Sequence, residues 1–348
     1  MALRLSGFTR ASSLGPIIDF MQGHGGSASR VLREVDLPLA LLHQPELVFP
    51  LREQFRFLER AARRTGDPFF GARLGQVVRA RNLSAYGAWV CSAQTLSQAI
   101  DRAQADLQTM LQTSTILRFT RSNTTASWSM EFVEPETEGR YHNELLGVSY
   151  MIDAVRNFTG RGWSPDVVMT TLPVGSPKAE LEDIFRANIS HGHAVNSIRF
   201  DAALLGNQRA MDWGSLTNSF PDAEPDVPIQ NDALATIESV IHLALYEGYP
   251  RIDWVASKLG LTRRSLQRLL EYHGGSFNQI AAQVIFSRAK TLLVGENNSI
   301  TEIAADLGYR DPAHFTRAFK RWAGVSPIIF RRQNKRLAAE PVRQNMVR

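Results

Sequence analysis

Two stretches near the C-terminus of this 348-residue chain repeat one pattern. Residues 251–260 read RIDWVASKLG, and residues 299–308 read SITEIAADLG. The apolar and small residues coincide at an offset of 48, and beyond the shared glycine the match continues at an offset of 49. The matched pairs are Ile252 with Ile300, Val255 with Ile303, Ala256 with Ala304, Leu259 with Leu307, Gly260 with Gly308, Leu266 with Phe315, Arg268 with Arg317 and Leu270 with Phe319. The duplication predicts that this region folds into two copies of one small unit.

Each copy has the pattern of a helix-turn-helix unit. Its first helix is short and carries apolar residues on one face, with a small alanine where a second helix can cross closely. The glycine after this helix suits the left-handed conformation that often follows a helix end. Thr262 and Asp311 are the expected N-caps of the second helices, and Pro312 stands in a first turn, where proline is tolerated. Ser299 and Glu302 also have the spacing of a capping box.

The second helix of each copy is the expected recognition helix. Its apolar stripe anchors it to the domain, and its remaining face is polar and basic. Arginine pairs with guanine and glutamine with adenine, so this face is suited to base edges, whereas Lys320 and Arg321 suit phosphate contacts. The residues expected to contact DNA are Arg263, Arg264, Ser265, Gln267, Arg268, Asp311, Ala313, His314, Arg317, Lys320 and Arg321.

The segment between the two copies, residues 276–294, is expected to form one long helix, with Ser276 as its N-cap. Such a helix would hold the two units at a fixed separation. Recognition helices about 34 Å apart can enter successive major grooves on one face of DNA. The repeat therefore predicts a module that reads two adjacent grooves.

The charge is distributed unevenly along the chain. Residues 250–348 contain 17 Lys and Arg against 7 Asp and Glu, whereas residues 1–249 contain 22 against 27. A basic module on a mildly acidic body indicates that only the module meets a polyanion. The alternative is a pair of ordinary helical hairpins with a solvated basic surface. The tandem duplication on the basic module favours DNA binding over that alternative.

The N-terminal part mixes helical and strand patterns. Helical spacing appears at residues 52–64, 95–111 and 141–158, and a further apolar helix is expected at 232–246, beyond this part. Alternation predicts a hairpin of strands 115–120 and 124–133 around a Ser122-Asn123 turn, and short strands at 167–172 and 197–200. The fold class predicted is an α+β N-terminal domain joined to an all-α C-terminal domain with two helix-turn-helix subdomains bridged by a long helix.

A proline-rich segment separates these two parts. Residues 218–230 read NSFPDAEPDVPIQ, with three prolines and three acidic residues and little apolar periodicity, which is typical of a linker. The predicted organisation is a domain at 1–217, a linker at 218–230, a DNA-binding domain at 231–332 and a basic flexible tail at 333–348.

The sequence offers little evidence of catalysis or metal binding. The GxSxG, GxxxxGK[ST] and HExxH motifs are absent, so we expect no catalytic residues, no enzymatic activity and no cofactor. His191 and His193 form only a weak metal-ligand pattern, and no metal site is expected. Cys91 is the only cysteine and lies in an apolar run, which favours a buried thiol over a redox sensor. With no apparent signal peptide or membrane span, a cytoplasmic protein is expected.

Residues 232 to 332 resemble the DNA-binding domain of the AraC/XylS family of bacterial regulators. The stretch SITEIAADLGYRDPAHFTRAFKRWAGVSP follows the family signature closely, and LGLTRRSLQRLLEYHGGSF also fits it. The resemblance implies seven helices in two subdomains, with base contacts from Arg264, Gln267 and Arg268 in the first. The matching positions in the second subdomain are Pro312, Ala313, His314 and Arg317. Because proline and alanine offer little hydrogen bonding, we expect the second unit mainly to hold the DNA backbone.

The N-terminal part resembles the effector-sensing domain that a subset of this family carries, distinct from a sugar-binding jelly roll. The resemblance rests on LREQFRFLERAARRTGDPFFGARLGQ at residues 51–76, on GRGWSPDVV, and on the stretch that ends near Phe200. It implies that this domain binds a small effector, dimerises, or both. The aromatic residues that could line an effector pocket, or simply fill the core, are Tyr86, Trp89, Trp128, Tyr141 and Trp163.

The function predicted from the sequence is sequence-specific regulation of transcription. The expected partners are double-stranded DNA, RNA polymerase, a small-molecule effector and a second copy of the chain, with no membrane. One alternative is a small-molecule-binding or enzymatic N-terminal domain with an accessory DNA-binding module. Another is an N-terminal domain that only dimerises and needs no ligand.

Overall fold

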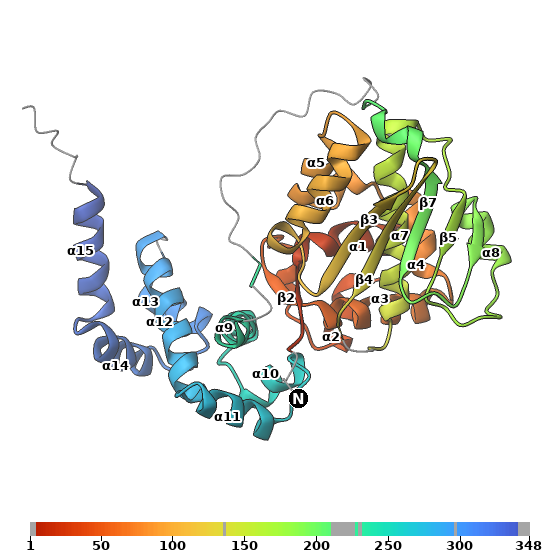
Figure 1. Ribbon diagram of the computed structural model, residues 1–348. Helices are drawn as coiled ribbons and strands as arrows, with labels where there is room; N and C mark the ends of the chain where they lie inside the picture. Colours follow the sequence, from red (N-terminus) through yellow and green to blue (C-terminus); the bar gives the residue numbers. More distant parts are fainter. Residues whose placement is uncertain (1–4, 135–136, 210–226, 229–231, 296–297, 340–348) are drawn as a thin grey trace, which may run out of the picture. The chain divides into compact units, whose positions relative to one another are not determined.

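The computed structural model describes residues 5–134, 137–209, 227–228, 232–295 and 298–339 (Figure 1). The chain divides into two compact units, Met1–Thr236 and Ile237–Arg348. The linker expected at 218–230 lies outside the described residues, apart from Val227 and Pro228. Val227 is buried, and its N–H donates to the Thr109 carbonyl at 3.3 Å, so this position packs on the N-terminal unit.

The N-terminal unit contains a five-stranded sheet in the order β3-β4-β7-β5-β6. Neighbouring strands are antiparallel except β5 and β6, which are parallel and are connected through helix α8. A second, two-stranded sheet pairs β1 with β2. The strands are β1 (Phe8–Arg10), β2 (Val48–Pro50), β3 (Thr115–Arg121), β4 (Thr125–Phe132), β5 (Val167–Met169), β6 (Asn188–Ser190) and β7 (Asn196–Asp201).

The predicted hairpin is present as β3 and β4, but its turn lies one residue later than expected. Ser122 is still paired, because its N–H donates to the Thr125 carbonyl at 2.7 Å. The turn is therefore centred on Asn123 and Thr124 rather than on Ser122 and Asn123. Alternate residues of β4 are buried, which places Trp128 on the core side of the sheet.

Helices cover the sheet of the N-terminal unit. The three helices predicted there from apolar spacing are present as α3, α6 and α7, and the core lies between them and the sheet. The helices are η1 (Ala11–Leu14), α1 (Gly15–Gly23), α2 (Ala28–Glu34), η2 (Leu39–Leu42), α3 (Leu51–Thr65), α4 (Phe70–Val77), η3 (Ala80–Asn82), α5 (Ala85–Cys91), α6 (Leu96–Met110), α7 (Arg140–Thr159), α8 (Ala179–Phe185) and η4 (Ala202–Gly206). Most residues of α7 are buried, because the sheet, α3, α4 and α5 all pack against it.

Helix α4 approaches α7 too closely for side chains at two of its positions. A Cβ on Gly71 would lie 1.9 Å from the His142 carbonyl oxygen, and a Cβ on Gly75 would lie 1.9 Å from Ser149 Oγ. These glycines are four residues apart, so they share one face of α4. The missing side chains allow the two backbones to pack directly.

The described part of the C-terminal unit is entirely helical. Helices α9 to α15 are the seven helices that the family resemblance implies. They are α9 (Ala233–Ala244), which begins at the end of the N-terminal unit, α10 (Ile252–Lys258), α11 (Arg263–Tyr272), α12 (Phe277–Gly295), α13 (Ile300–Asp306), α14 (Pro312–Ala323) and α15 (Pro327–Ala339), with a short 3-10 turn η5 (Leu245–Glu247) after α9. The segment 232–246, predicted as a single helix, is thus α9 followed by η5.

The predicted helix caps are confirmed. Thr262 Oγ1 accepts from the Ser265 N–H at 3.1 Å, and Asp311 Oδ1 accepts from the Ala313 N–H at 2.8 Å. Ser299 and Glu302 form a complete capping box. The glycines after α10 and α13 have φ of 72° and 78°, in the left-handed region expected of them.

The sequence predicted a flexible tail from residue 333 onward. Helix α15 instead continues to Ala339, so residues 333–339 are helical. Pro327 begins this helix at a position where proline is tolerated, and Arg331 fastens it to α12. Arg331 Nε donates to the Leu293 carbonyl at 3.2 Å, and Arg331 Nη2 donates to the Asn298 carbonyl at 2.6 Å. Residues 340–348 of the predicted tail lie outside the described residues. Across the described chain, no helix has the length and apolar character needed to cross a membrane.

Candidate nucleic-acid interface and buried cavity

Helix α11 is anchored by leucines and presents a polar face. Leu266 and Leu270 are fully buried against the helical core. The opposite face exposes Arg264, Gln267 and Arg268, and none of these side chains forms a hydrogen bond or ion pair with another described residue. This helix therefore offers three long hydrogen-bonding side chains that are available to a partner.

Two other predicted contacts on α11 are tied to the protein itself. Ser265 is half-buried, and its hydroxyl lies 2.9 Å from Thr262 Oγ1, beside the helix cap. Arg263 is exposed and forms an ion pair at 3.3 Å with Asp253 of α10. The first side chain supports the start of the helix, and the second links the two helices of the unit.

Helix α14 is anchored by aromatic rings. Phe315 and Phe319 are fully buried. The Phe319 ring centroid lies 5.4 Å from that of Phe286 on α12 and 5.4 Å from that of Phe330 on α15. The predicted contacts that remain exposed on α14 are Ala313, His314, Arg317, Lys320 and Arg321.

Asp311 was predicted as a DNA contact and is exposed at the start of α14. Its carboxylate accepts the Ala313 N–H, and His314 Nε2 lies 3.6 Å from Asp311 Oδ2. A carboxylate near phosphates is also electrostatically unfavourable. The geometry therefore favours a capping role for Asp311 over a direct contact.

The two helix-turn-helix units contact each other, although no local sequence pattern predicts this contact. The glycine turn after α13 lies against the segment that precedes α10: a Cβ on Gly308 would be 2.1 Å from the Tyr249 nitrogen. The neighbouring rings of Tyr249 and Tyr309 have centroids 5.9 Å apart, in an edge-to-face arrangement. This contact and the bridging helix α12 together fix how α11 and α14 are placed.

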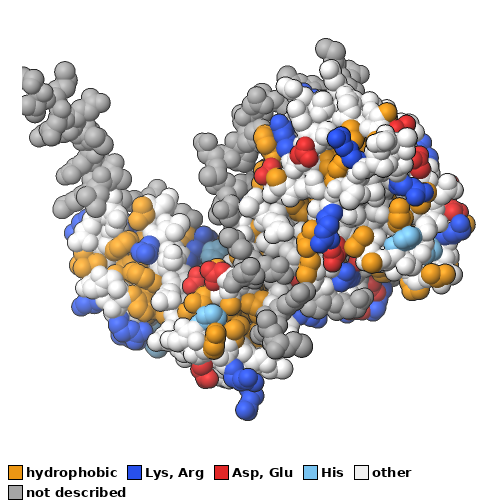
Figure 2. Space-filling view, in the orientation of Figure 1, with side chains coloured by type: hydrophobic (Ala, Val, Ile, Leu, Met, Phe, Trp, Pro, Cys, Tyr) orange, Lys and Arg blue, Asp and Glu red, His pale blue; other side chains and the backbone are white. Residues whose placement is uncertain are grey.

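The exposed basic residues give the C-terminal unit a positively charged surface. Figure 2 shows Lys and Arg side chains on the part of its surface where Figure 1 places α11 and α14. This surface matches the excess of basic residues in the last third of the sequence. It is suited to a polyanion such as the DNA backbone.

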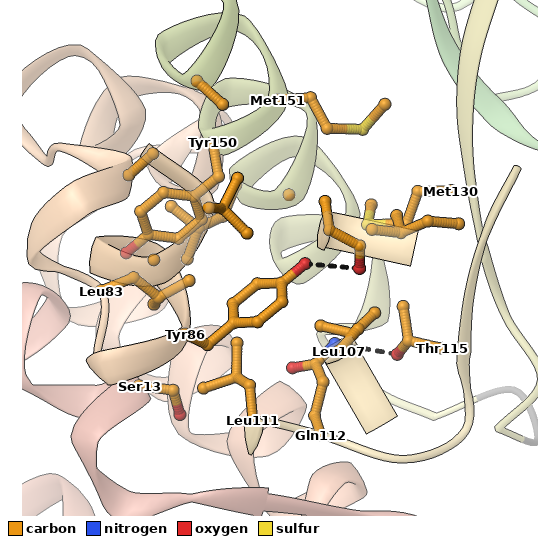
Figure 3. A pocket seen from close by; sticks show the side chains of 18 of the residues that line it. Ser13, Leu83, Tyr86, Leu107, Leu111, Gln112, Thr115, Met130, Tyr150 and Met151 are labelled. Carbon is orange, nitrogen blue, oxygen red and sulfur yellow. Dashed lines mark hydrogen bonds between the residues drawn. The ribbon is translucent and has the colours of Figure 1, made fainter. Parts of the chain in front are cut away.

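The N-terminal unit contains a buried cavity of about 100 Å³ between α5, α6, α7 and the hairpin β3–β4 (Figure 3). Its wall is mostly apolar. It is lined by Ser13, Gln54, Ala80, Leu83, Tyr86, Gly87, Val90, Ala103, Leu107, Leu111, Gln112, Thr115, Leu117, Trp128, Met130, Phe132, Asn143, Leu146, Gly147, Tyr150, Met151 and Ala154. Tyr86 and Trp128, two of the aromatic residues singled out in the sequence, are therefore brought together.

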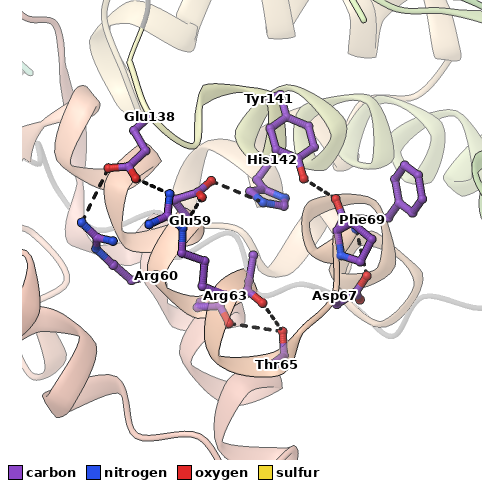
Figure 4. Close-up of polar contacts among 12 residues, drawn as sticks. Glu59, Arg60, Arg63, Thr65, Asp67, Phe69, Glu138, Tyr141 and His142 are labelled. Carbon is purple, nitrogen blue, oxygen red and sulfur yellow. Dashed lines mark hydrogen bonds and ion pairs between the residues drawn. The ribbon is translucent and has the colours of Figure 1, made fainter. Parts of the chain in front are cut away.

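The other aromatic residues singled out do not line this cavity. Trp89 Nε1 donates to Asp106 Oδ2 at 2.7 Å, and the Arg102 guanidinium stacks on its ring. The Tyr141 hydroxyl donates to the Pro68 carbonyl at the opposite side of α7 (Figure 4). Trp163 packs its ring edge-to-face against Phe200, with centroids 5.9 Å apart.

Most polar groups of the cavity wall already have protein partners. Gln54 accepts from Ser13 Oγ at 2.5 Å and donates through Nε2 to Asn143 Oδ1 at 2.7 Å. The Tyr86 hydroxyl donates to the Ala103 carbonyl at 2.9 Å (Figure 3). Two buried polar atoms of the wall, Trp128 Nε1 and the Tyr150 hydroxyl, have no hydrogen-bond partner among the described residues.

The two histidines of the weak metal-ligand pattern, His191 and His193, bond to different hydroxyl groups. His191 Nδ1 lies 2.7 Å from Thr170 Oγ1, whereas His193 Nε2 lies 2.8 Å from Ser190 Oγ. The described residues contain no group of three or more His, Cys, Asp or Glu side chains placed to hold a metal. Cys91 is buried as expected, and burial raises the pKa of its thiol to about 12.

Two family models match the chain, one in each unit. A model described as the arabinose-binding domain of AraC transcription regulator, N-terminal, matches residues 25–208, which is more than half of the chain. A model described as a helix-turn-helix domain matches residues 255–333. The second match contains α11, α12, α13 and α14, the helices that build the candidate interface.

Individual proteins are also similar to this chain. The chain is 24% identical over 344 residues to the HTH-type transcriptional regulator VirS of Mycobacterium tuberculosis, covering 94% of this chain and 98% of VirS. It is 34% identical over 83 residues to the HTH-type transcriptional regulator VqsM of Pseudomonas aeruginosa, covering 24% of this chain and 26% of VqsM. Among solved structures, the transcriptional regulator CdpR of Pseudomonas aeruginosa aligns with 87% of this chain and 97% of its own, at a TM-score of 0.37 and 20% identity.

Proposed function

We propose, from the premise that this chain belongs to the AraC family of transcriptional regulators, that α11 and α14 enter adjacent major grooves of DNA and that a small effector in the N-terminal unit controls this binding. The chain is a DNA-binding regulator by its family. The proposal adds which side chains read the DNA and where the effector binds.

The observation that carries the proposal is the exposed face of α11. Arg264, Gln267 and Arg268 project from a helix that leucines hold rigidly, and they have no partner among the described residues. A rigid support is needed for base readout, because a contact that must first be ordered loses free energy on binding. Arginine and glutamine also present the paired donors and acceptors that distinguish guanine and adenine in the major groove.

Helix α14 contributes mainly to affinity in this proposal. Its first turn consists of the capping Asp311, then Pro312 and Ala313, and these offer a base few hydrogen bonds. Arg317, Lys320 and Arg321 are exposed further along the helix. We assign base or phosphate contact to Arg317 and phosphate contact to the other two.

The buried cavity supports an effector role for the N-terminal unit. Its wall contains no Asp, Glu, His, Lys, Arg or Cys side chain, so it offers no charged acid, base or thiol nucleophile. This favours binding over the enzymatic alternative. Family membership also supports a second copy of the chain and RNA polymerase as protein partners, and the cytoplasm as the site of action.

The test is recovery of genomic DNA fragments by the purified full-length protein at several salt concentrations. A shared motif that spans about two helical turns supports readout by both units. Binding without a shared motif, lost uniformly as salt rises, would contradict base readout and leave only phosphate binding.

A further inference from the structure

The wall of the buried cavity carries no formal charge. All of its polar side chains are neutral amides, hydroxyls or an indole. An ionised ligand would lose its hydration there without gaining a counter-ion, which is strongly unfavourable. The cavity therefore selects against carboxylates, phosphates and ammonium groups.

The polar wall groups are also mostly occupied. Ser13, Gln54 and Asn143 are hydrogen-bonded in one chain, and Gln112 Nε2 donates to Thr115 Oγ1 at 2.8 Å. A sugar carries a hydroxyl on most of its carbon atoms, and each buried hydroxyl needs a partner. The wall does not offer enough open partners for such a ligand.

Two deeply buried donors of the wall have no hydrogen-bond partner among the described residues. The indole Nε1 of Trp128 can only donate, and the Tyr150 hydroxyl can also donate. Both atoms are buried and lack a partner among the described residues, an arrangement that is unfavourable in an otherwise satisfied protein interior. Because both atoms have almost no accessible surface in the free protein, a ligand acceptor removes this penalty only where the same wall movement that admits the ring also uncovers them.

The size of the cavity limits the ligand further. Its volume is about 100 Å³. An apolar cavity of about 150 Å³ is large enough to hold benzene. The cavity is smaller than that, so a ligand of about one aromatic ring enters only when flexible wall side chains such as Met130 and Met151 move aside.

We infer that this cavity binds an uncharged, largely apolar molecule of about the size of one substituted aromatic ring, and that an acceptor on this molecule pairs with Trp128 Nε1 or with the Tyr150 hydroxyl. The role of this molecule as an effector rests on the proposed function. The chemical class follows from the cavity alone.

Four probes test the class by calorimetry and thermal melting of the full-length protein. Acetophenone and ethylbenzene are neutral and similar in size, and only acetophenone carries an acceptor. Benzoate adds a charge, and arabinose is the sugar that the matching family model names. We expect both neutral aromatics to bind and to raise the melting temperature, and benzoate and arabinose to do neither. Binding of benzoate or arabinose as tight as that of acetophenone, or no binding of either neutral aromatic, would overturn the inference.

Variants test the acceptor contact. Tyr150→Phe and Trp128→Phe each remove one open donor, and Tyr86→Phe is the matched control because its hydroxyl is already bonded to the Ala103 carbonyl. We expect Tyr150→Phe, Trp128→Phe or both to lower the affinity for acetophenone by about 2- to 10-fold, which is the effect of one hydrogen bond. The affinity for ethylbenzene should fall less. Tyr86→Phe should leave the preference for acetophenone unchanged. An acceptor contact would be contradicted if the variants lost affinity for acetophenone and ethylbenzene equally, or if neither variant lost affinity for acetophenone.

Folding does not confound this test. Tyr150→Phe keeps the ring and removes a hydroxyl without a partner, so the free protein should melt at or above the wild-type temperature. Binding of the same preparations to the recovered DNA motif separates the two proposals. Motif binding without aromatic binding refutes the ligand class alone, whereas aromatic binding that leaves DNA affinity unchanged refutes the effector role alone.

Discussion

Gly308 lies so close to Tyr249 that a Cβ at position 308 would be 2.1 Å from the Tyr249 nitrogen. The contact joins the turn of the second helix-turn-helix unit to the segment that leads into the first. Because Gly308 has a φ of 78°, the same residue also makes the turn that ends α13. Glycine is therefore required at position 308 for two reasons, the left-handed turn and the close approach to Tyr249.

We expect Gly308→Ala to destabilise the C-terminal unit and to disturb the spacing of α11 and α14. The left-handed backbone alone costs about 1–2 kcal/mol for an alanine, and the displaced Tyr249 contact adds to this. Urea unfolding should show the loss of stability, and affinity should fall more for a two-groove site than for a half-site. Gly324→Ala is the matched control, because Gly324 has a φ of 76° and open space around its Cβ position. Equal effects of both substitutions would show that the Tyr249 contact does not set the spacing.

Arg268→Ala should weaken binding to the recovered motif by about 10- to 100-fold, the value of one good arginine–base contact, and relax the preference at one base pair. Arg317→Ala should also weaken binding to the motif. Both side chains are exposed, so the melting temperature should stay unchanged. Arg332→Ala on α15 removes an equal exposed charge as a control. The assigned readout would be refuted if Arg268→Ala and Arg317→Ala both bound the DNA motif with the affinity and specificity of the wild type.

Lys320→Ala should reduce affinity for all sequences alike and leave the motif unchanged. A lysine that neutralises one phosphate contributes about one unit to the slope of log affinity against log salt concentration. Titrations at several salt concentrations should therefore show a slope smaller by about one. Lys178→Ala in the N-terminal unit removes the same charge and should not change the slope. A change in base preference on replacing Lys320 would count against a phosphate contact.

Local signals in the sequence predicted the C-terminal unit well. The caps at Thr262, Ser299 and Asp311 and the two turn glycines each act within a few residues, so the sequence alone contains the relevant chemistry. The contact of Gly308 with Tyr249 joins residues about 60 positions apart in the printed sequence, and no local pattern reports it.

The N-terminal unit was less predictable because its elements depend on tertiary packing. The strand predicted at 167–172 is present as β5 but ends at Met169, and β6, which has only three residues, is too short for alternation to be recognised. Helix α4 packs through glycines rather than through an apolar stripe. The sequence could not separate Trp128, which lines the cavity, from Trp89, whose indole is bonded to Asp106, since residue type does not reveal a partner.

His142 is a buried histidine of α7 beside an ion-pair network of Glu59, Glu138 and two arginines (Figure 4). Its Nε2 lies 3.7 Å from Glu59 Oε2, and its Nδ1 is buried without a partner among the described residues. Burial lowers the pKa of His142 to about 4, although the negative charges of Glu59 and Asp67 act in the opposite direction. The native protein therefore holds this imidazole neutral at pH values where the unfolded chain protonates it.

This difference makes the stability of the N-terminal unit depend on pH. Between the unfolded pKa of about 6.5 and the native pKa of about 4, the unfolded state binds more protons, so the free energy of unfolding falls as the pH falls. The loss attributable to His142 should approach about 3 kcal/mol near pH 4. Urea unfolding of wild type and His142→Gln from pH 7 to pH 4.5 should show a flatter dependence in the variant. His24→Gln, at an exposed position outside this network, is the control substitution, and equal slopes for all three proteins would rule out His142 as the cause.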